Sequence, residues 1–199
     1  MGQIYFPSCN FSAASPAAAK KIRDYMEAKM PVAECCRTDR LPYPEGSQAI
    51  YFCQACRETL EARADGRYIM KNLFEVLVED ECFLWPDHTG LTVTVQDCWR
   101  DREHPEIFAA VRTALGKMNI EIIEMTENME KSRFCGNLHF DGRPLLELSE
   151  EEQAVWMRKQ VEKFPVETAV TYCNRCTRGI KAGGGKAVHL LELAMDTYK

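Results

Sequence analysis

Short runs of β-branched and aromatic residues recur along the chain, and each run leads into a cysteine. The runs are too short for helices and have the composition of buried strands, so we predict a strand at each of them. The predicted strands cover residues 4–6, 49–52, 91–95 and 169–172. The cysteines that follow them are Cys9, Cys53, Cys98 and Cys173. Every predicted strand therefore brings a thiol to its carboxyl end.

Two prolines mark the starts of predicted helices. Pro16 and Pro105 each stand seven residues after the cysteine of the preceding strand, and proline is favoured in the first turn of a helix. Ser15 is a suitable N-cap for the first of these helices. Apolar residues recur at helical period after both prolines, which predicts helices over residues 16–29 and 105–117.

A Cys-x-x-Cys pair occurs in each half, and an apolar segment follows it. The pairs end at Cys56 and Cys176, and the segments after them predict helices over residues 67–79 and 186–197. His189 falls on the second of these helices, where we interpret it as a helix histidine with one satisfied hydrogen bond.

A segment present only in the second half, roughly residues 137–165, predicts a helical insertion. Ser149 followed by three glutamates is a capping-box pattern that opens a helix. The apolar residues Val155, Trp156 and Val161 would lie on that helix.

The same order of elements is predicted twice: strand, cysteine, helix, strand, cysteine, strand, Cys-x-x-Cys and helix. Strands that alternate with helices favour parallel α/β layers. We therefore predict an α/β fold of two tandem pseudo-repeated Rossmann-like units, with short parallel sheets and cysteines at the strand carboxyl ends. The units would cover residues 1–85 and 86–199.

Cysteine content sets this chain apart from an ordinary globular protein. There are ten cysteines in 199 residues, and 46% of the residues are hydrophobic, which is enough for a core without disulfides. The N-terminus lacks the basic and apolar regions of a secretory signal, so we expect a soluble, cytoplasmic protein. In a reducing compartment, metal or redox chemistry is favoured over the alternative of a disulfide framework.

Charge and hydropathy weigh against two further classes of function. The net charge is −5 and neither half is basic, which argues against nucleic-acid binding. No apolar run approaches the length of a membrane span. One local basic cluster stands out, and we interpret it either as a solvated face or as a docking site for an acidic partner or an anionic thiol. It comprises Arg175, Arg178, Lys181 and Lys186.

The predicted topology gathers nine of the cysteines into two sets, because the carboxyl ends of neighbouring parallel strands face one crevice. The first set is Cys9, Cys35, Cys36, Cys53 and Cys56. The second set is Cys98, Cys135, Cys173 and Cys176. Four thiolates suit a zinc ion or a cubane iron–sulfur cluster, and five exceed both. Cys82 belongs to neither set, and we predict a small buried residue or a linker thiol there.

The arrangement Cys…Cys-Cys…Cys-x-x-Cys, met twice, resembles the cysteine-rich CCG domain family over nearly the whole chain. Tandem CCG domains occur in the cysteine-rich subunit of heterodisulfide reductase and in relatives linked to glycolate, lactate, glycerol-3-phosphate and succinate oxidation. In heterodisulfide reductase each five-cysteine motif holds a noncubane 4Fe-4S cluster, where a disulfide is reductively cleaved. In some relatives a CCG domain holds zinc instead.

Each motif departs from the family pattern at one or two positions. In the first, Arg37 follows the double cysteine in place of glycine, and only 16 residues separate Cys36 from Cys53. In the second, Gly136 is present but Phe134 replaces the first cysteine of the pair. The resemblance thus implies a 4Fe-4S cluster, cubane or noncubane, at the first set, and zinc or a second 4Fe-4S cluster at the second set.

Together, the cysteine sets and the resemblance predict an iron–sulfur-cluster-binding redox protein for electron transfer. As in the cysteine-rich subunit of heterodisulfide reductase, disulfide reduction could accompany this role. The chain has no flavin or nicotinamide motif, so an iron–sulfur or flavin partner protein would supply electrons. Two alternatives stay open: a zinc-binding structural or interaction module without a redox role, and a thiol–disulfide oxidoreductase that uses a Cys-x-x-Cys pair between a strand and a helix.

Overall fold

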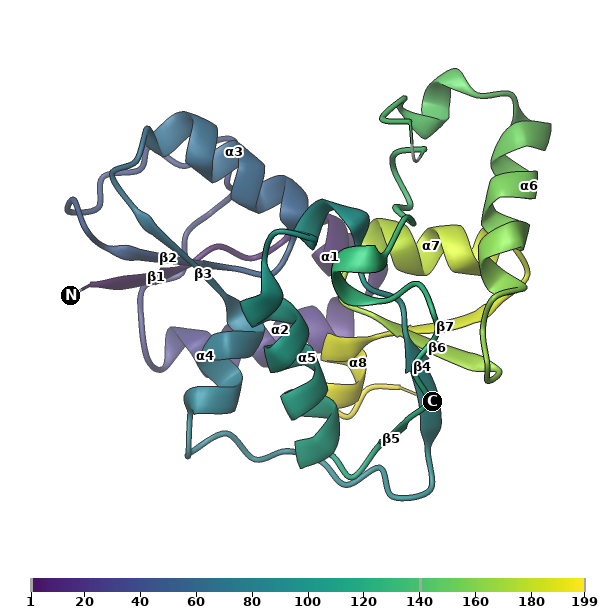
Figure 1. The fold of residues 1–199 in the computed structure, drawn as a ribbon. Helices are drawn as coiled ribbons and strands as arrows, with labels where there is room; N and C mark the ends of the chain where they lie inside the picture. The colour runs from purple at the N-terminus through teal and green to yellow at the C-terminus, as the bar shows by residue number, and fades with distance from the viewer. Residues whose placement is uncertain (1, 140, 199) are drawn as a thin grey trace.

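A computed structural model describes residues 2–139 and 141–198 of the chain. These residues form two separate sheets with helices packed around them (Figure 1). Every strand pair in both sheets is parallel. The predicted α/β class with short parallel sheets is therefore confirmed, whereas the unit boundary near residue 85 stays a prediction. Within the described ranges, no helix combines the length and apolarity needed to cross a bilayer.

The first sheet has the strand order β1-β2-β3. Its strands are β1 (Gln3–Tyr5), β2 (Gln48–Tyr51) and β3 (Ile69–Asn72). The helices of this half are α1 (Cys9–Ala14), α2 (Pro16–Glu27), α3 (Gln54–Ala64) and α4 (Leu73–Glu79). Helix α2 starts at the predicted proline. Ser15 occupies its N-cap position without capping it, because the Ser15 hydroxyl donates a 2.7 Å hydrogen bond to Glu192 instead.

The second sheet has the strand order β5-β4-β6-β7. Its strands are β4 (Thr92–Val95), β5 (Glu121–Ile122), β6 (Thr168–Thr171) and β7 (Lys186–His189). Its α-helices are α5 (Pro105–Lys117), α6 (Glu150–Val161), α7 (Asn174–Ala182) and α8 (Leu190–Ala194). Three short 3₁₀ turns complete it: η1 (Trp99–Asp101), η2 (Met129–Lys131) and η3 (Leu145–Glu147). Helix α5 matches its predicted range, and α6 begins after the predicted Ser149 capping box.

The last element of each half differs from the prediction of one continuous helix. The segments 67–79 and 186–197 each begin with a strand, β3 or β7, and only then become helical. Their first apolar residues pair with the neighbouring strand rather than forming a helical face. Asn72 and His189 end these strands, and each forms a capping box that starts the following helix.

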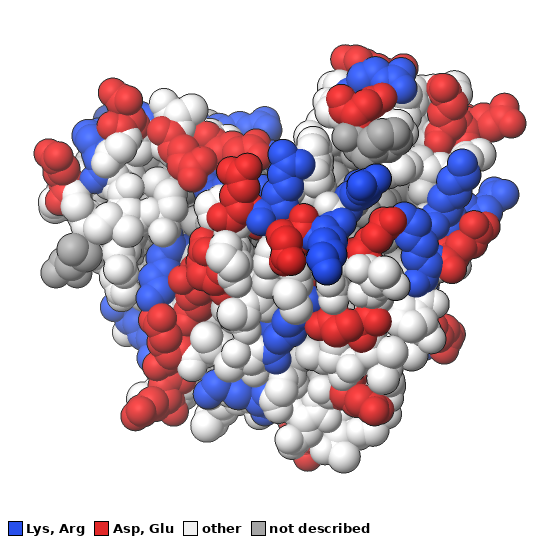
Figure 2. Space-filling model, in the orientation of Figure 1, with Lys and Arg blue, Asp and Glu red and all other residues white. Residues whose placement is uncertain are grey.

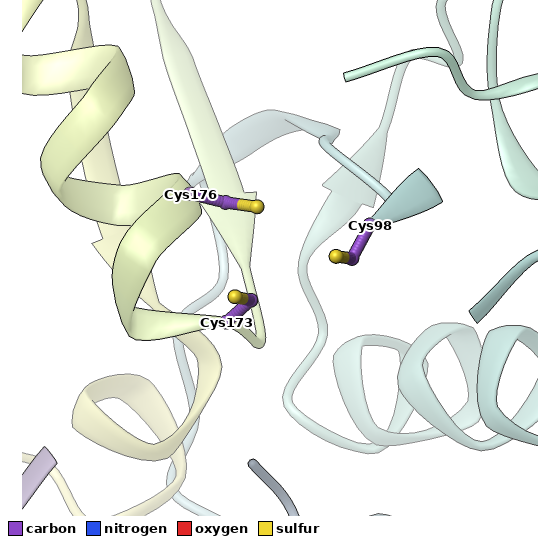
Figure 3. Close-up of side chains that lie close together, drawn as sticks. All are labelled: Cys98, Cys173 and Cys176. Atoms are coloured by element: carbon purple, nitrogen blue, oxygen red, sulfur yellow. The ribbon is translucent and has the colours of Figure 1, made fainter. Parts of the chain in front are cut away.

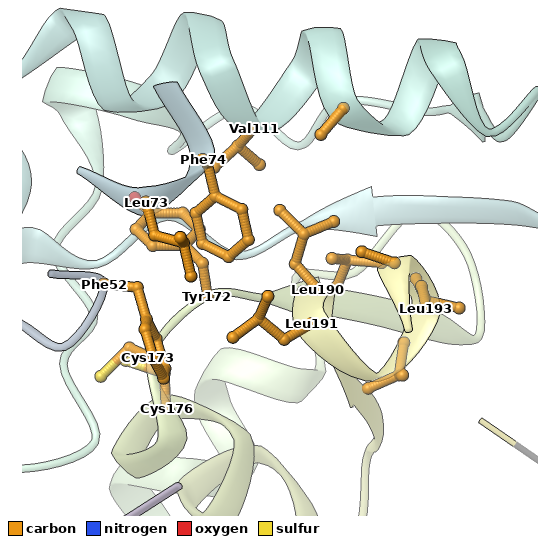
Figure 4. Close-up of a cluster of buried hydrophobic side chains, with 14 of the residues drawn as sticks. Phe52, Leu73, Phe74, Val111, Tyr172, Cys173, Cys176, Leu190, Leu191 and Leu193 are labelled. Atoms are coloured by element: carbon orange, nitrogen blue, oxygen red, sulfur yellow. The ribbon is translucent and has the colours of Figure 1, made fainter. Parts of the chain in front are cut away.

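Helices from the two halves pack against each other in the centre of the molecule. Helix α4 lies against α5, and α2 lies against α8 (Figure 1). The buried side chains between the sheets therefore come from both halves and form one cluster, part of which is drawn in Figure 4. It includes Phe52, Phe74, Val111, Tyr172, Leu190 and Leu193. A second, smaller cluster fills the other face of the first sheet, beneath α3. Packing around this shared core holds the strand ends of both sheets near each other.

Candidate metal centres

Three cysteines of the second set converge on one point. The sulfur atoms of Cys98, Cys173 and Cys176 all lie within 4.8 Å of one another, and all three residues are buried (Figure 3). Cys98 follows β4, Cys173 follows β6, and Cys176 lies in the first turn of α7. The convergence arises because β4 and β6 are neighbours in the sheet and end at the same edge.

Cys135, the remaining member of the second set, contacts this group from the loop before the insertion. Side-chain hydrogen bonds from Cys176 and Cys98 lower the pKa of its thiol to about 3, and the backbone amides of Asn137 and Leu138 act in the same direction. Amides aimed at a sulfur favour its thiolate form, which is the form that binds metal. The loop is thus arranged to hold Cys135 as an anion.

Gly136 allows this loop to approach helix α7. A Cβ atom at this position would lie 2.0 Å from the carbonyl oxygen of Arg175 and 2.7 Å from the amide nitrogen of Cys176. Such contacts cannot be accommodated, so the position requires glycine. At this close distance the Gly136 amide donates a hydrogen bond of 3.4 Å to the sulfur of Cys176.

The four thiols of the second set divide into two donors and two acceptors. Side-chain hydrogen bonds from Cys176 and Cys98 hold the pKa of Cys173 well below its usual value, as they do for Cys135. Hydrogen bonds with these two acceptors raise the pKa values of Cys98 and Cys176. A thiophilic cation would replace the two donated protons, and metal binding at this set would release protons accordingly.

A buried polar network supports the second set from beneath the sheet. The Cys98 amide donates to the hydroxyl of Tyr172 at 3.2 Å, and that hydroxyl donates to Asp97 at 3.3 Å. Asp97 in turn forms a 2.8 Å ion pair with Arg112 on α5. These contacts fix the position of Cys98 through groups that are themselves fixed.

Phe134, which directly precedes Cys135, has a packing role. Its side chain is fully buried and stacks on Trp156 of α6, with ring centroids 6.1 Å apart and an interplanar angle of 23°. The ring also reaches the space beside Gly179 on α7. The residue therefore joins the insertion to the core, and the second set keeps four cysteines.

The first set is more open than the second. Cys9 is exposed, Cys35 and Cys53 are half-buried, and Cys36 and Cys56 are buried. Over residues 2–139 and 141–198, no three of these five ligand atoms come as close together as those of the second set. The set is therefore spread over a wider area, with one side open to solvent.

Pairwise thiol interactions nevertheless connect the whole first set. Hydrogen bonds from the Arg37 amide and from the Cys9 thiol lower the pKa of Cys35, and burial raises that of Cys36, which contacts both Cys35 and Cys56. A hydrogen bond with Cys56 lowers the pKa of Cys53 to about 6, and the same interaction raises the pKa of Cys56. The five thiols thus form a continuous series from Cys9 to Cys53.

The short loop after the double cysteine is held by Asp39 and Arg63. Asp39 accepts a 2.7 Å hydrogen bond from the Leu41 amide. Arg63 on α3 donates to the carbonyl oxygens of Cys36 at 2.6 Å and Asp39 at 2.8 Å. Arg37 is exposed here, so this loop does not make the close backbone approach that requires Gly136 in the second set.

The two sets lie close enough for their charges to interact, as expected for two units whose cysteine-bearing edges lie near each other. The charge of Cys173 raises the pKa of Cys53, against the larger effect of Cys56. Between the sets lies an ion pair of 2.7 Å between Arg57 on α3 and Asp101 on η1, with Gln54 donating to the same carboxylate at 2.5 Å. No sequence motif marks these residues, because their contact depends on how the two sheets pack.

The structure narrows one single-residue prediction and corrects another. Cys82 is exposed, which excludes a small buried residue and leaves the alternative of a linker thiol. His189 is a strand-end N-cap rather than a residue within a helix, and its Nδ1 accepts a hydrogen bond from the Leu191 amide at 3.2 Å. Its ring lies against Phe11 and Phe52 of the first half, with centroids 4.5 and 5.8 Å away. The histidine therefore belongs to the contact between the halves.

Neither a family model nor a curated protein matches the chain. The fold and the site define it as a cysteine-rich α/β protein with one buried cysteine group, Cys98, Cys173 and Cys176, that is compatible with metal binding.

Proposed function

We propose that this protein is an iron–sulfur-cluster-binding redox protein that transfers electrons. The observation that carries the proposal is the continuous series of five interacting thiols in the first set, the last of which, Cys53, is affected by the charge of Cys173 in the second set. One metal ion needs at most four thiolates, so a series of five supports a polynuclear centre. A neighbouring second centre would give electrons a short route through the protein.

The first set fits a 4Fe-4S cluster held by Cys9, Cys35, Cys36, Cys53 and Cys56. Two of its thiols, Cys35 and Cys53, have lowered pKa values and favour the thiolate form required for ligation. Such a cluster supplies reversible one-electron transfer when bound. The chain contributes the ligands, the hydrogen bonds to sulfur, and an opening to solvent at Cys9.

That opening also supports disulfide reduction at the first set, the reaction of heterodisulfide reductase. Cleaving one S–S bond to two thiols consumes two electrons and two protons. The chain carries no flavin or nicotinamide motif, so the electrons would come from an iron–sulfur or flavin partner protein. The protons would come from solvent, which reaches the exposed Cys9.

Zinc at the second set is a second candidate, favoured by its compactness. With Zn–S bonds of about 2.3 Å, a tetrahedral site places its sulfurs about 3.8 Å apart. The sulfurs of Cys98, Cys173 and Cys176 lie within 4.8 Å of one another, and Cys135 contacts two of them. Zinc here would brace the fold beside the redox centre. Zinc at both sets would make the protein a structural module.

Purification without oxygen, followed by assay of iron, zinc and sulfide and by visible and EPR spectra, tests the proposal. We expect iron and sulfide in equal amounts and a visible band that bleaches on reduction. Cys36→Ser should remove most of this signal, and the control Cys82→Ser should leave it intact, because Cys82 lies outside both sets. A colourless protein with stoichiometric zinc and no sulfide would refute the electron-transfer role.

A further inference from the structure

A groove of about 350 Å³ runs along helix α7, directly beside the second cysteine set. Three cations of α7, Arg175, Arg178 and Lys181, line one side of it. The opposite side is formed by the η3 turn, which carries Leu146, and by Met157 of α6. The insertion of the second half therefore creates this groove, which we call the α7 groove.

The α7 groove is positively charged in a protein that is acidic as a whole. The net charge of the chain is −5, yet no aspartate or glutamate lines the groove. None of Arg175, Arg178 and Lys181 forms an ion pair with any described carboxylate. On the face drawn in Figure 2, acidic and basic side chains are intermixed. Unpaired, exposed cations beside one groove favour an anionic ligand.

The spacing of the cations indicates an extended ligand. They recur every three residues along α7, so the first and last lie about 9 Å apart along the helix axis. A chain segment with several carboxylates can place one acidic group beside each of the three cations.

An apolar contact is available at the rim of the groove. Leu146 is 83% exposed, whereas its neighbour Leu145 is buried and anchors the η3 turn. An exposed leucine beside a row of cations suits a ligand with both acidic and apolar side chains. Protein segments commonly combine acidic and apolar side chains, whereas inorganic anions have no apolar group.

The α7 groove and the second cysteine set share part of their lining. Gly136 lines the groove, and its amide donates to the sulfur of Cys176 at 3.4 Å. Arg175 lies between the two cysteines of the pair and contacts Gly136 through its carbonyl. A ligand in the groove would therefore lie one residue away from a metal-binding thiol.

We infer that the α7 groove docks an acidic segment of a redox partner protein, with carboxylates on Arg175, Arg178 and Lys181 and an apolar side chain against Leu146. The inference rests on the proposed function, because an electron-transfer protein needs its partner within reach of its cluster. Complementary charge would also speed the encounter of the two proteins and make it dependent on salt.

Fluorescence anisotropy with a labelled synthetic peptide of alternating glutamate and leucine tests this docking surface. The intact protein should bind the peptide saturably, and added salt should weaken binding. The variant Arg178→Glu with Lys181→Glu should bind at least about tenfold more weakly, because each lost pair also becomes a repulsion. Leu146→Ser should weaken binding about threefold to fivefold through loss of apolar contact.

Matched controls separate the groove from general effects. Arg23→Glu with Lys117→Glu makes the same charge change at exposed positions without ion pairs in the described structure, and Leu84, which is 88% exposed, permits Leu84→Ser. Both control variants should bind like the parent protein. Equal losses in the groove and control variants would overturn the inference. So would displacement of the peptide by tripolyphosphate, or by vesicles of anionic lipid, at concentrations as low as those of unlabelled peptide.

Metal content of the same preparations distinguishes the two proposals. A protein with iron and sulfide that binds no peptide would refute the docking surface and leave the redox proposal standing. A protein without iron that binds the peptide only through the groove residues would refute the redox proposal and support the docking surface.

Discussion

Arg57 and Asp101 form an ion pair across the two halves of the chain, with 2.7 Å between Nη1 and Oδ1. Both side chains are almost completely removed from solvent. Each also stands close to a cysteine set: Arg57 follows Cys56 on α3, and Asp101 lies on the 3₁₀ turn that Cys98 caps. The pair therefore fixes the position of one set relative to the other.

Arg57→Met should destabilise the protein by about 3–5 kcal/mol, because it leaves the Asp101 carboxylate buried without its cation. Burial raises the pKa of Asp101 to about 6 even with Arg57 present, and loss of the cation would raise it further. Chemical unfolding at neutral pH measures the effect. Adding Asp101→Asn should recover part of the loss. The exposed-pair variant Lys20→Met should change stability by less than about 1 kcal/mol. A similarly small effect of Arg57→Met would contradict the prediction.

His189 should make the fold sensitive to acid. Burial lowers its pKa to about 3, below the unfolded value of about 6.5, so the unfolded chain binds more protons between these values. Above pH 6.5 the titration of His189 should not reduce the free energy of unfolding. Below pH 6.5 the free energy of unfolding should fall as the pH falls, by at most about 1.4 kcal/mol per pH unit from this residue. Unfolding free energies measured from pH 7.5 to pH 5 give the slope.

His189→Asn is the variant that isolates this effect. Asparagine is a good N-cap, and Asn72 performs that role at the same place in the first half. The variant should keep α8 capped and lose the part of the slope due to the imidazole, at a cost of about 1–2 kcal/mol at neutral pH for the space left beside Phe11 and Phe52. An unchanged slope would show that other groups, such as the thiolates, cause the acid sensitivity.

Gly136→Ala should disrupt the second cysteine set. The added Cβ would lie 2.0 Å from the Arg175 carbonyl, so the loop carrying Cys135 must move away from α7. We expect a loss of about 1–3 kcal/mol and reduced metal content at this set. Gly116→Ala is the matched control: it lies in helix α5, its Cβ would meet no atom within 4 Å, and it should stabilise by about 0.5–1 kcal/mol. Normal metal content in Gly136→Ala would refute the proposed close approach.

Local signals in the sequence predicted strands β1, β2, β4 and β6, the proline-started helices and the grouping of Cys98, Cys173 and Cys176. These features depend on short segments: Pro105 starts α5 whatever packs against it. The strand-to-helix change at His189 was missed because its apolar neighbours suit either structure, and pairing with β6 decides between them. The Arg57–Asp101 pair was missed because 44 residues separate its members and only the packing of the halves brings them together.

Phe134→Cys would create a double cysteine with Cys135, and we expect it to weaken the protein rather than add a useful ligand. The Phe134 ring is fully buried, stacks on Trp156 and fills space beside Gly179, so its loss should cost about 3 kcal/mol. Phe134→Leu, which keeps most of the apolar volume, should cost about 1–2 kcal/mol. Thermal unfolding together with iron and zinc assays measures both effects. A cysteine variant that gained iron while keeping its full stability would contradict this expectation. It would mean that position 134 is suited to a metal ligand and that Phe134 has no essential packing role. The expected result would instead show that this position joins the insertion, and with it the α7 groove, to the core.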